Sequence, residues 1–566
     1  MTEVTTAERT LEGTGVSPGI AVGPLVQMGA PIAELPTPVT GGVPDVELGR
    51  AQRALEEVAR DLEARRDRAD GDAVAVLDAL SMMARDPALI DAVAQAVDAG
   101  NPAPHAVDEA ITGFRTMLEA AGGYLAERAA DLNDLRNRVV ARLLHLPMPG
   151  VPDREDPFVL AADDLAPADT VDLRPGHVLA IVTRRGGPTS HTAIIAKAMG
   201  LPCIVGCVGV DEVTGGTTVI VDGSAGRVVV NPTDDELAAA ERRRAAREAL
   251  LASSEGPGVT ADGHPVQLLL NIGASAAGAA DEVDAEGVGL LRTEFLFLDR
   301  SEEPTVAEQT ATYREVFTGY AGRKVVVRTL DVGADKPSPF VDPGPGDNPA
   351  LGLRGWRLRE NNPGLIERQL EAIAAAAATA PCEVWVMAPM IATVAEAEAF
   401  VAMAGGAGID MAGVMVEVPA LALQAEQLVE VVDFVSLGTN DLSQYTFAAD
   451  RLVGELGELL DPWQPAVLEL IARTAAAGRT AEVPVGVCGE AASDPNLALV
   501  LTGMGCTSLS MSPNAVPEVR AALAATSLAT CELLAERAVS ARDGRDARAR
   551  VQAALDTADT GAPATP

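Results

Sequence analysis

His191 stands in a segment whose composition could support phosphoryl transfer. The run Gly186–Gly206 reads GGPTSHTAIIAKAMGLPCIVG, and the apolar run 177–183 (HVLAIVT) precedes it. The apolar run predicts a buried strand, and the Gly, Pro, Thr and Ser residues predict a turn and an N-cap. Thr192–Met199 then predicts a helix that Gly200 ends. Free N–H groups and the helix dipole favour an anion at such a place. An imidazole there could accept a phosphoryl group, although a histidine near a helix start is more often structural.

A second set of chemically capable residues follows short apolar runs in the C-terminal half of the chain. Eight such runs occur, at 266–273, 288–293, 325–333, 384–390, 413–419, 434–441, 483–490 and 508–513. Helical stretches separate most of them, which indicates a parallel sheet covered on both faces. Eight repeats within about 270 residues match a (β/α)₈ TIM barrel, whose active site lies at the C-terminal ends of the strands.

Polar residues recur at those strand ends. They are Asn271, Arg292, Arg328, Asp331, Glu417, Asn440, Asp441, Cys488 and Glu490, with Lys336, Arg354 and Arg451 in the loops just beyond. Several arginines around one mouth suit a multiply charged anion, because guanidinium matches phosphate and carboxylate bidentately. Glu417 and Asp441 are hard oxygen ligands suited to Mg²⁺, and the alternative is ion pairing with the arginines. Cys488 could be a buried small residue, or in such a mouth it could exchange protons with a substrate carbon.

The composition is that of an acidic protein with aliphatic cores. The 566 residues are 48% hydrophobic and only 3% aromatic, and their length suggests about three or four domains. The net charge of −38 argues against nucleic acid or an anionic membrane as the main partner. We find no apolar run long enough to span a membrane, and MTEVTTAERTLEG does not resemble a signal peptide, so we expect a cytoplasmic protein. The six scattered cysteines predict reduced thiols and no zinc site.

The order of patterns along the chain predicts a multidomain α/β protein. We divide it into an α/β domain carrying His191 (1–32 and 147–231), an inserted helical bundle (33–146), a linker helix (232–257), a barrel (258–535) and a flexible tail (536–566). Helical periodicity marks four stretches of the insertion, at 45–68, 72–85, 104–121 and 124–146. The charged segment Asp234–Ala252 and the break at 253–258 indicate a hinge between two halves.

Several long motifs carry a family resemblance. They are GGPTSH, GVGLLRTEFLF, VVRTLDVGADK, NPALGLRG, VMVEVPA, FVSLGTNDLSQYTFAADR and VCGE. Together, and in family order, they resemble the phosphoenolpyruvate–protein phosphotransferases, Enzyme I of the bacterial sugar phosphotransferase system. This family belongs to a wider group that includes pyruvate phosphate dikinase. The resemblance extends from GVSPGIAVG at 15–23 to SLSMSP at 508–513.

The resemblance assigns a role to each candidate residue. It implies that His191 is phosphorylated through Nε2 and that Cys488 donates a proton, with Glu417 and Asp441 binding Mg²⁺. Contacts to phosphoenolpyruvate would come from Arg292, Arg328, Asn440, Asp441 and Arg451. The phosphoryl group would then pass from a swivelling His191 domain to a histidine of the phosphocarrier HPr, with release of pyruvate. HPr would dock on the helical insertion, which includes residues 127–131, and the barrel would form a homodimer.

Some positions depart from the family pattern, and two other functions compete with it. Pro188 lies in the Gly-Gly-x-Thr-Ser-His loop, Ala334 stands where a second Gly is common, and 77–87 is the part of the insertion least alike. A dikinase or phosphoenolpyruvate synthase would need a nucleotide-binding domain ahead of His191, where a helical bundle without a P-loop-like sequence is predicted. A non-catalytic sensor of phosphoenolpyruvate is the other alternative, but it would be expected to lack residues such as Cys488. The sequence does not separate the sugar and nitrogen branches, although we expect no sensor domain before residue 15, which favours the sugar branch.

Overall fold

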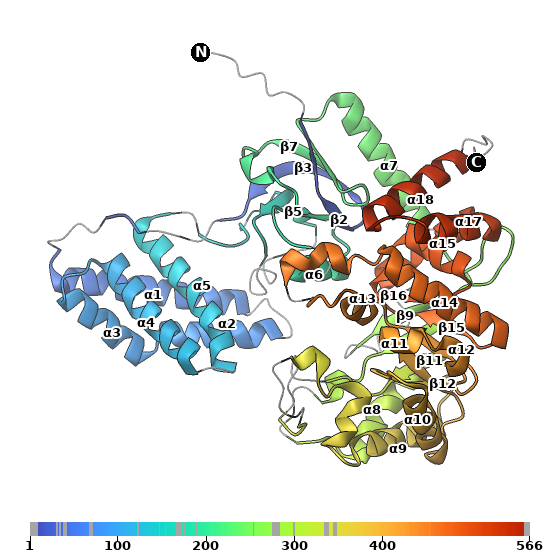
Figure 1. The fold of residues 1–566 in the computed structure, drawn as a ribbon. Coiled ribbons are helices and arrows are strands. Elements are labelled where there is room, and N and C mark those ends of the chain that lie inside the picture. The colour runs from blue at the N-terminus through green and yellow to red at the C-terminus, as the bar shows by residue number, and fades with distance from the viewer. Residues whose placement is uncertain are drawn as a thin grey trace. The chain divides into compact units, whose positions relative to one another are not determined.

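The computed structural model describes residues 9–559 apart from 30–31, 33–34, 38–41, 67–71, 122–123, 147, 153, 155, 166–172, 174–175, 188–189, 253, 274–282, 298–299, 301, 333–338, 343, 345–347 and 452. The chain divides into two compact units, Met1–Arg244 and Ala245–Pro566. Figure 1 labels many of the helices and strands of both units. Each unit is described by itself.

A mixed sheet forms the first part of the N-terminal unit. Its strands are β1 (Arg9–Glu12), β2 (Thr14–Ser17), β3 (Ile20–Gln27), β4 (Phe158–Ala162), β5 (Val178–Thr183), β6 (Cys203–Val205), β7 (Thr218–Asp222) and β8 (Arg227–Val230), in the order β1-β8-β7-β3-β4-β5-β6-β2. Strands β3 to β6 run parallel. Along β4, Val159 and Ala161 enter one hydrophobic core, whereas Leu160 and Ala162 enter another. Both faces of the sheet are therefore covered, as near-continuous apolar strands require.

The insertion is a bundle of α1 (Pro44–Arg66), α2 (Asp72–Ala84), α3 (Pro87–Asp98), α4 (Ala103–Ala121) and α5 (Tyr124–Leu144). Four of these were predicted, and α3 was not. Asp86 caps α3 by accepting the Ala88 N–H at 2.8 Å, and Pro87 occupies its first turn. The buried face of α3 includes Leu89 and Val93. The cap, the proline and the four-residue apolar spacing were all readable signals for this helix.

Helix α7 (Asp234–Ala252) occupies the charged segment inside the predicted linker, 232–257. Its N-terminal part packs on the sheet of the first unit, where Ala240 joins Ile220 and Val229 in a small apolar cluster. The boundary between the two compact units falls inside this helix, after Arg244. Beyond that boundary, Arg247 forms an ion pair with Glu518 of the second unit. A single helix thus contributes residues to both units.

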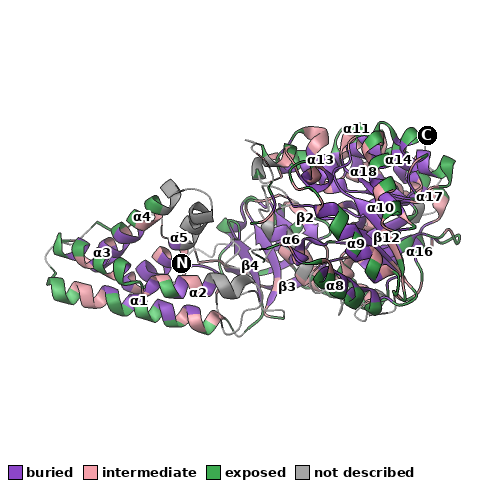
Figure 2. Ribbon diagram, turned by 90° about the horizontal axis from the view of Figure 1, so that it is seen from below, coloured by how far each residue is buried: buried purple, intermediate pink, exposed green. Residues whose placement is uncertain are grey.

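The second unit is a closed barrel of parallel strands, as the sequence predicts. The strands are β9 (Gln267–Ile272), β10 (Gly287–Leu291), β11 (Lys324–Arg328), β12 (Glu383–Ala388), β13 (Ala412–Val416), β14 (Val435–Leu437), β15 (Val485–Val487) and β16 (Ser508–Met511). Each coincides with one of the eight apolar runs, although most are shorter. Figure 2 shows buried residues on the strands and on the inner sides of the surrounding helices. The barrel's apolar core is large and aliphatic, with few aromatic residues such as Trp463.

Helices cover the outside of the barrel. They are α8 (Val306–Gly319), α9 (Leu365–Ala377), α10 (Val394–Gly406), α11 (Pro419–Ala422), α12 (Ala425–Leu428), α13 (Thr439–Phe447), α14 (Pro465–Ala481), α15 (Pro495–Met504), α16 (Val516–Ala525), α17 (Leu528–Val539) and α18 (Gly544–Asp559). Short 3₁₀ helices include η3 (Glu294–Leu296), η5 (Gly355–Glu360) and η7 (Glu490–Ser493). The predicted run 434–441 splits into a three-residue strand and the start of α13, so its last residues lie on a helix.

The prediction of a flexible tail over 536–566 is wrong for its described part. Helix α17 continues to Val539, and α18 occupies Gly544–Asp559. Ala547 and Val551 of α18 are fully buried in the barrel core. These two residues are four apart and therefore share one helix face. The Arg and Asp residues around them made this apolar spacing hard to recognise in the sequence.

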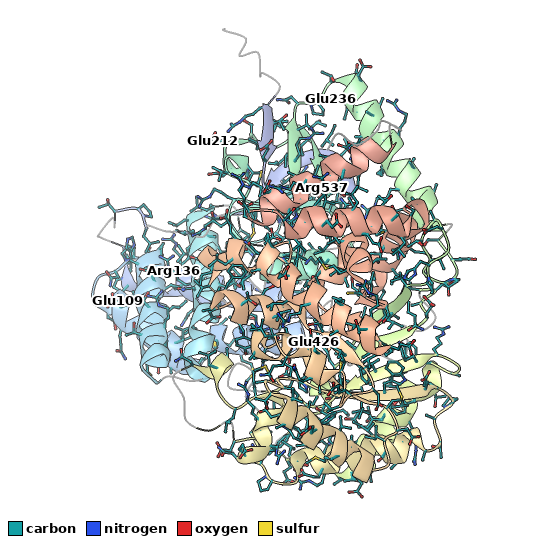
Figure 3. All side chains as sticks on the ribbon, turned by 45° about the vertical axis from the view of Figure 1, so that its right-hand side comes forward. Glu109, Arg136, Glu212, Glu236, Glu426 and Arg537 are labelled. Carbon is teal, nitrogen blue, oxygen red and sulfur yellow. The ribbon has the colours of Figure 1, made fainter. Side chains whose placement is uncertain are left out.

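Charged side chains cover the surfaces of both units. Glu109, Glu212, Glu426 and Arg537 are exposed examples, labelled in Figure 3. Within the described residues, the structure has no helix that is both long and apolar enough to cross a bilayer.

Candidate active site

His191 is the first residue of α6 (His191–Met199), which follows β5. The Ser190 side chain caps the helix by accepting the Ala193 N–H at 3.3 Å. Gly200 ends it in the left-handed conformation, with φ of 65°. The predicted sequence of strand, loop and helix is therefore confirmed, and the backbone of His191 lies at a helix N-terminus.

Thr192 anchors the start of α6. Its buried hydroxyl donates to Asp164 Oδ1 at 2.9 Å and accepts the Leu165 N–H at 3.3 Å. This pairing fixes the helix start against the segment that follows β4. The side chain of His191 and the loop residues 188–189 lie outside the described residues, so the role of His191 remains a prediction.

In the second unit, Arg328 and its acidic neighbours lie at the C-terminal ends of β10 and β11. The Arg328 guanidinium donates to Glu294 in η3 and pairs with Asp331 at 3.0 Å. Burial alone would lower the pKa of Arg328, but the carboxylates of Glu294, Asp331 and Glu417 more than offset it and the pKa is raised. Arg328 is thus a fixed cation beneath the mouth of the barrel.

Arg354 extends the same buried ion-pair network through Asp331. Its Nε and Nη2 donate to the two oxygens of Asp331 at 3.1 and 2.8 Å, and its Nη1 donates to Asp441 Oδ1 at 2.8 Å. Tyr445 lies beside it, with its hydroxyl 3.4 Å from Nη1. Arg354 is only 3% exposed, so these contacts are almost fully desolvated. It holds the loop after β11 against the first turn of α13.

Glu417 follows β13 and is 1% exposed. Its Oε1 accepts the Met390 N–H at 2.6 Å, and Met390 adopts a positive φ of 62° that a side-chain-bearing residue rarely takes. The pKa of Glu417 is raised to about 8, first by burial and then by the nearby carboxylates Asp441 and Asp331, against a lowering by Arg328 and Arg354. The protein therefore holds a carboxylate where its own environment penalises the negative charge.

The charges of this buried cluster do not balance. Its four carboxyl groups belong to Glu294, Asp331, Glu417 and Asp441, and its two guanidinium groups to Arg328 and Arg354. Full ionisation would leave a surplus of two negative charges, which a divalent cation would neutralise. Among the described residues, no three His, Cys, Asp or Glu side chains form a metal site by themselves. Two carboxylates completed by water and substrate oxygens are a usual set for Mg²⁺, so Glu417 and Asp441 fit that ion.

The remaining predicted substrate contacts surround this cluster. Arg292 follows β10 and is exposed, and Arg451 is partly buried with its Nη1 3.8 Å from Asp441 Oδ2. Asn440 and Asp441 lie in the first turn of α13, where Asn440 Oδ1 accepts the Glu490 N–H at 3.2 Å. The barrel thus presents two arginines at the outer edge of the cluster and two within it.

Cys488 directly follows β15 and is buried. Its Sγ lies 3.4 Å from the Leu437 carbonyl oxygen. Asn271 of β9 donates through Nδ2 to the carbonyl oxygens of Cys488 and Ser510, both at 3.1 Å. Burial raises the pKa of the Cys488 thiol to about 11, against a lowering by the Ser436 hydrogen bond. The thiol therefore carries its proton at neutral pH, as a general acid must.

Gly489 sets the position of Cys488 by close packing. A Cβ at this residue would lie 1.8 Å from Thr439 Oγ1 and 2.8 Å from the Thr439 backbone nitrogen. Because the backbone of Gly489 is extended, the conflict is one of space and not of conformation. We predict that Gly489→Ala displaces the Cys488 segment from α13 and lowers turnover about 100-fold or more. Steady-state kinetics will measure this, with Gly405→Ala as control because a Cβ there meets nothing within 4 Å. Equal activity of both variants would contradict the assignment.

Several buried polar atoms around the mouth lack a hydrogen-bond partner among the described residues. They are Thr329 Oγ1, Thr439 Oγ1, Glu294 Oε2 and Arg328 Nε. Buried polar atoms are nearly always paired in proteins, and unpaired ones commonly mark a place for water or a ligand. They lie at or just beyond the ends of β10, β11 and β14, three of the strands whose ends carry predicted site residues.

The structure adds residues to the predicted site. Glu294 received no role from the sequence, although the motif RTEFLF contains it, and Arg354 and Asp331 were noted without one. Their importance comes from ion pairs that only the fold reveals. Lys336 and Ala334 lie outside the described residues.

Family comparisons cover most of the chain. Residues 12–128 match the PEP-utilising enzyme N-terminal domain, residues 154–226 match the mobile domain, and residues 247–528 match the PEP-binding domain.

Curated relatives match over nearly the full length. A phosphoenolpyruvate-protein phosphotransferase of Streptomyces coelicolor is 50% identical, covering 97% of this chain and 99% of the relative. One from Haloferax volcanii is 42% identical, covering 94% of this chain and 97% of the relative. A multiphosphoryl transfer protein of Xanthomonas campestris is 37% identical, covering 96% of this chain and 67% of the relative.

Proposed function

The chain belongs to the PEP-utilising enzymes and, within them, to the phosphoenolpyruvate-protein phosphotransferases, and from this we propose how its residues carry out the reaction. Phosphoenolpyruvate phosphorylates His191, pyruvate is released, and the phosphoryl group then passes to a histidine of the phosphocarrier HPr. The observation that carries the proposal is the buried cluster of carboxylates and arginines beside Cys488. It combines anion-binding cations, a cation-binding pair of oxygens and a protonated thiol at one end of the barrel.

The arginines bind and orient the substrate. Arg328 is already fixed by its ion pairs, whereas Arg292 and Arg451 at the edge are more exposed and close on the phosphate and carboxylate. Asn440, in the turn that also carries Asp441, supplies an amide donor to the same ligand. Preformed cations favour the transition state because no reorganisation is needed as charge moves.

Glu417 and Asp441 would hold Mg²⁺ at this mouth. When bound, the ion would neutralise charge on the phosphate and on the enolate oxygen that leaves. The Met390 N–H meanwhile fixes Glu417 Oε1, so that the other carboxylate oxygen remains directed to the site. Cys488 then gives its proton to the methylene carbon, and the enolate becomes pyruvate.

Magnesium binding will stabilise the protein if this pair is the site. We predict that saturating Mg²⁺ raises the melting temperature of the wild-type barrel, since a ligand at 100 times its Kd contributes about 2.7 kcal/mol. Glu417→Gln should lose this rise, because an amide is a weaker ligand and removes one negative charge. Differential scanning calorimetry with and without Mg²⁺ will test it, with the exposed Glu371→Gln as control. An unchanged rise in Glu417→Gln would place the ion elsewhere.

The transfer step requires His191 of the first unit to reach the barrel mouth of the second. We assign this movement to the segment 232–257, because α7 carries the boundary between the units and a Ser- and Gly-rich break follows it. A loose phosphoryl-transfer transition state needs positioning and charge stabilisation, which the cluster provides. Docking of HPr on the helical insertion, a homodimer through the barrel and a cytoplasmic location are further parts of the proposal that rest on the family.

Labelled phosphoenolpyruvate tests the function directly. The protein is incubated with the phosphate-labelled compound and Mg²⁺, without nucleotide. We expect acid-labile label on the wild type together with pyruvate release, no label on His191→Ala, and normal label on the control His264→Ala. Label that appears only with ATP would indicate a dikinase, and no label under any condition would indicate a sensor.

A further inference from the structure

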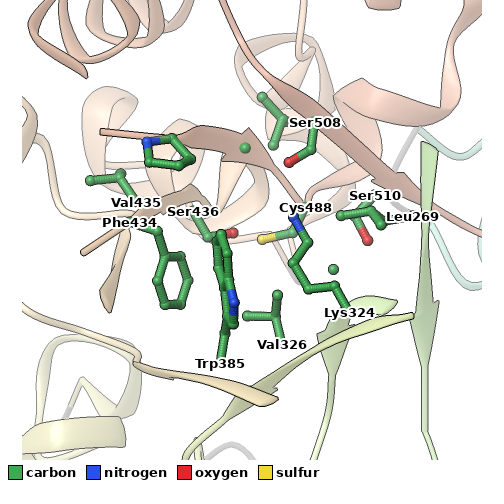
Figure 4. Close-up of a pocket in the computed structure, with 14 residues that line it drawn as sticks. Leu269, Lys324, Val326, Trp385, Phe434, Val435, Ser436, Cys488, Ser508 and Ser510 are labelled. Atoms are coloured by element: carbon green, nitrogen blue, oxygen red, sulfur yellow. The ribbon is translucent and has the colours of Figure 1, made fainter. Parts of the chain in front are cut away.

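The interior of the barrel contains a cavity that runs beneath Cys488. Its volume is about 20 Å³, and its lining includes Lys324, Trp385, Ser436, Cys488, Ser508 and Ser510. Lys324 and Ser508 are the first residues of β11 and β16, whereas Cys488 follows the last residue of β15. Because all strands run parallel, the cavity extends from the N-terminal end of the barrel to the thiol. Figure 4 shows these side chains gathered around one space.

The lining is unusually polar for the inside of such a barrel. Branched aliphatic side chains commonly fill this space. Here Ser436, Ser508 and Ser510 are buried, and Gly289 and Gly486 leave room for two of the hydroxyls. A Cβ at Gly289 would lie 2.5 Å from Ser510 Oγ, and one at Gly486 would lie 2.4 Å from Ser508 Oγ. The sequence therefore places hydroxyl groups where apolar packing would have been possible.

The two ends of the cavity carry groups that can exchange protons. At the upper end, the Ser436 hydroxyl and the Cys488 thiol line the same space. At the lower end, Lys324 Nζ donates to Gln267 Oε1 at 2.5 Å and lies 4.4 Å from the centre of the Trp385 ring. Burial lowers the pKa of Lys324, against a raising by the nearby Glu383 and Glu286. An ammonium group in this setting releases a proton more readily than one on the surface.

The volume suits water and little else. A buried water needs about 10–15 Å³ and two to four polar partners, so the cavity has room for about one or two. The serine hydroxyls and the Lys324 ammonium supply such partners. The same volume is too small for a substrate or cofactor.

We propose that this cavity returns a proton to Cys488 from the N-terminal end of the barrel, through Ser436, water and Lys324. The inference rests on the proposed function, in which the Cys488 S–H bond breaks as a C–H bond forms on the enolate. The thiolate then takes the Ser436 hydroxyl proton, Ser436 takes one from water, and water takes one from the Lys324 ammonium. The Lys324 amine recovers its proton from solvent at the lower end of the barrel. The Cys488 thiolate is thereby reprotonated while the substrate mouth of the barrel stays closed.

Isotope exchange distinguishes this route from reprotonation of Cys488 by solvent at the substrate mouth. The enzyme is incubated in D₂O with phosphoenolpyruvate and carbon-labelled pyruvate, and both label exchange and deuterium in the pyruvate methyl group are measured. In the wild type we expect deuterium to enter freely, because the thiol proton mixes with solvent. In Ser436→Ala and Lys324→Met, the proton taken from pyruvate is handed back to the next substrate. We expect the deuterium entering per carbon exchange to fall at least about tenfold.

Controls keep the outcomes separate. Thr474→Val removes another buried hydroxyl of the barrel, one that donates to Leu470 O at 2.9 Å, and should leave the ratio unchanged. If Ser436→Ala loses carbon exchange altogether, its deuterium ratio cannot be measured. The ratio in Lys324→Met, at the far end of the cavity, is then the test. An unchanged ratio in Lys324→Met would overturn the proposal. Absence of carbon exchange in the wild type would instead refute the proposed function.

Discussion

Replacing Arg354 with alanine is expected to abolish phosphorylation by phosphoenolpyruvate and to destabilise the barrel by about 3–5 kcal/mol. The guanidinium of Arg354 donates twice to Asp331 and once to Asp441, and it is almost completely buried. Its removal leaves carboxylates facing one another without their shared cation. Such uncompensated buried charge costs far more than the loss of a surface ion pair.

The loss of activity has a separate cause from the loss of stability. Arg354 ties the loop after β11 to the first turn of α13, and that turn carries both Asn440 and Asp441. Without the tie, the proposed metal oxygen of Asp441 and the amide of Asn440 lose their common position. Displacements of about 1 Å at such groups commonly cost about 100-fold in rate.

Thermal unfolding and labelling with phosphoenolpyruvate will measure the two effects. Arg359→Ala is the matched control, because Arg359 lies in the adjoining η5 and is only partly buried over the Trp356 ring. Arg354→Ala combined with Asp331→Asn should recover part of the stability, since one of the unpaired charges is then gone. Wild-type stability and labelling in the Arg354→Ala variant would refute the role given to this network.

The contrast between Arg354 and the strand-end residues explains what the sequence could predict. Apolar runs identified all eight barrel strands, and strand polarity then placed Glu417 and Cys488 at one end. No comparable rule assigns a partner to an arginine in a long loop. The Arg354 contacts depend on how a loop after β11 meets a helix after β14, which is information about packing and not about pattern.

The same reasoning accounts for the smaller differences. Asp441 was placed on a strand because the run 434–441 is continuous in the sequence, yet α13 begins directly after Gly438. A Cβ at Gly438 would lie 2.9 Å from Glu417 Oε2, so the turn there is set by contact with the site. Helix α18 was missed because its sequence is rich in Arg, Asp and Ala, although Ala547 and Val551 are buried in the core and Ala554 and Leu555 pack against it.

Cys488→Ala should slow pyruvate formation by about 100- to 10,000-fold, the usual contribution of a positioned general acid. The KM for phosphoenolpyruvate should change little, because the thiol lies below the arginines and has no part in binding phosphate or carboxylate. The raised pKa of Cys488 keeps the thiol protonated at neutral pH and ready for each enolate. The rate of pyruvate formation by Cys488→Ser should lie between those of the wild type and Cys488→Ala, because a hydroxyl fits the space but is a weaker acid than a thiol.

Cys488 could act as the proton donor or only as a packing residue. The stereochemistry of the pyruvate methyl group distinguishes these two roles. Cys506→Ala removes another buried thiol, whose pKa burial raises to about 12, and it should keep normal turnover. Stereospecifically deuterated phosphoenolpyruvate converted in tritiated water should yield a chiral methyl group with the wild type, because Cys488 protonates one face of the enolate. In Cys488→Ala the enol has no acid beneath it and collects its proton from solvent on either face, so the methyl group becomes racemic. A variant that is slow but still yields a chiral product would show that another residue delivers the proton, because loss of packing alone changes the rate without exposing the second face.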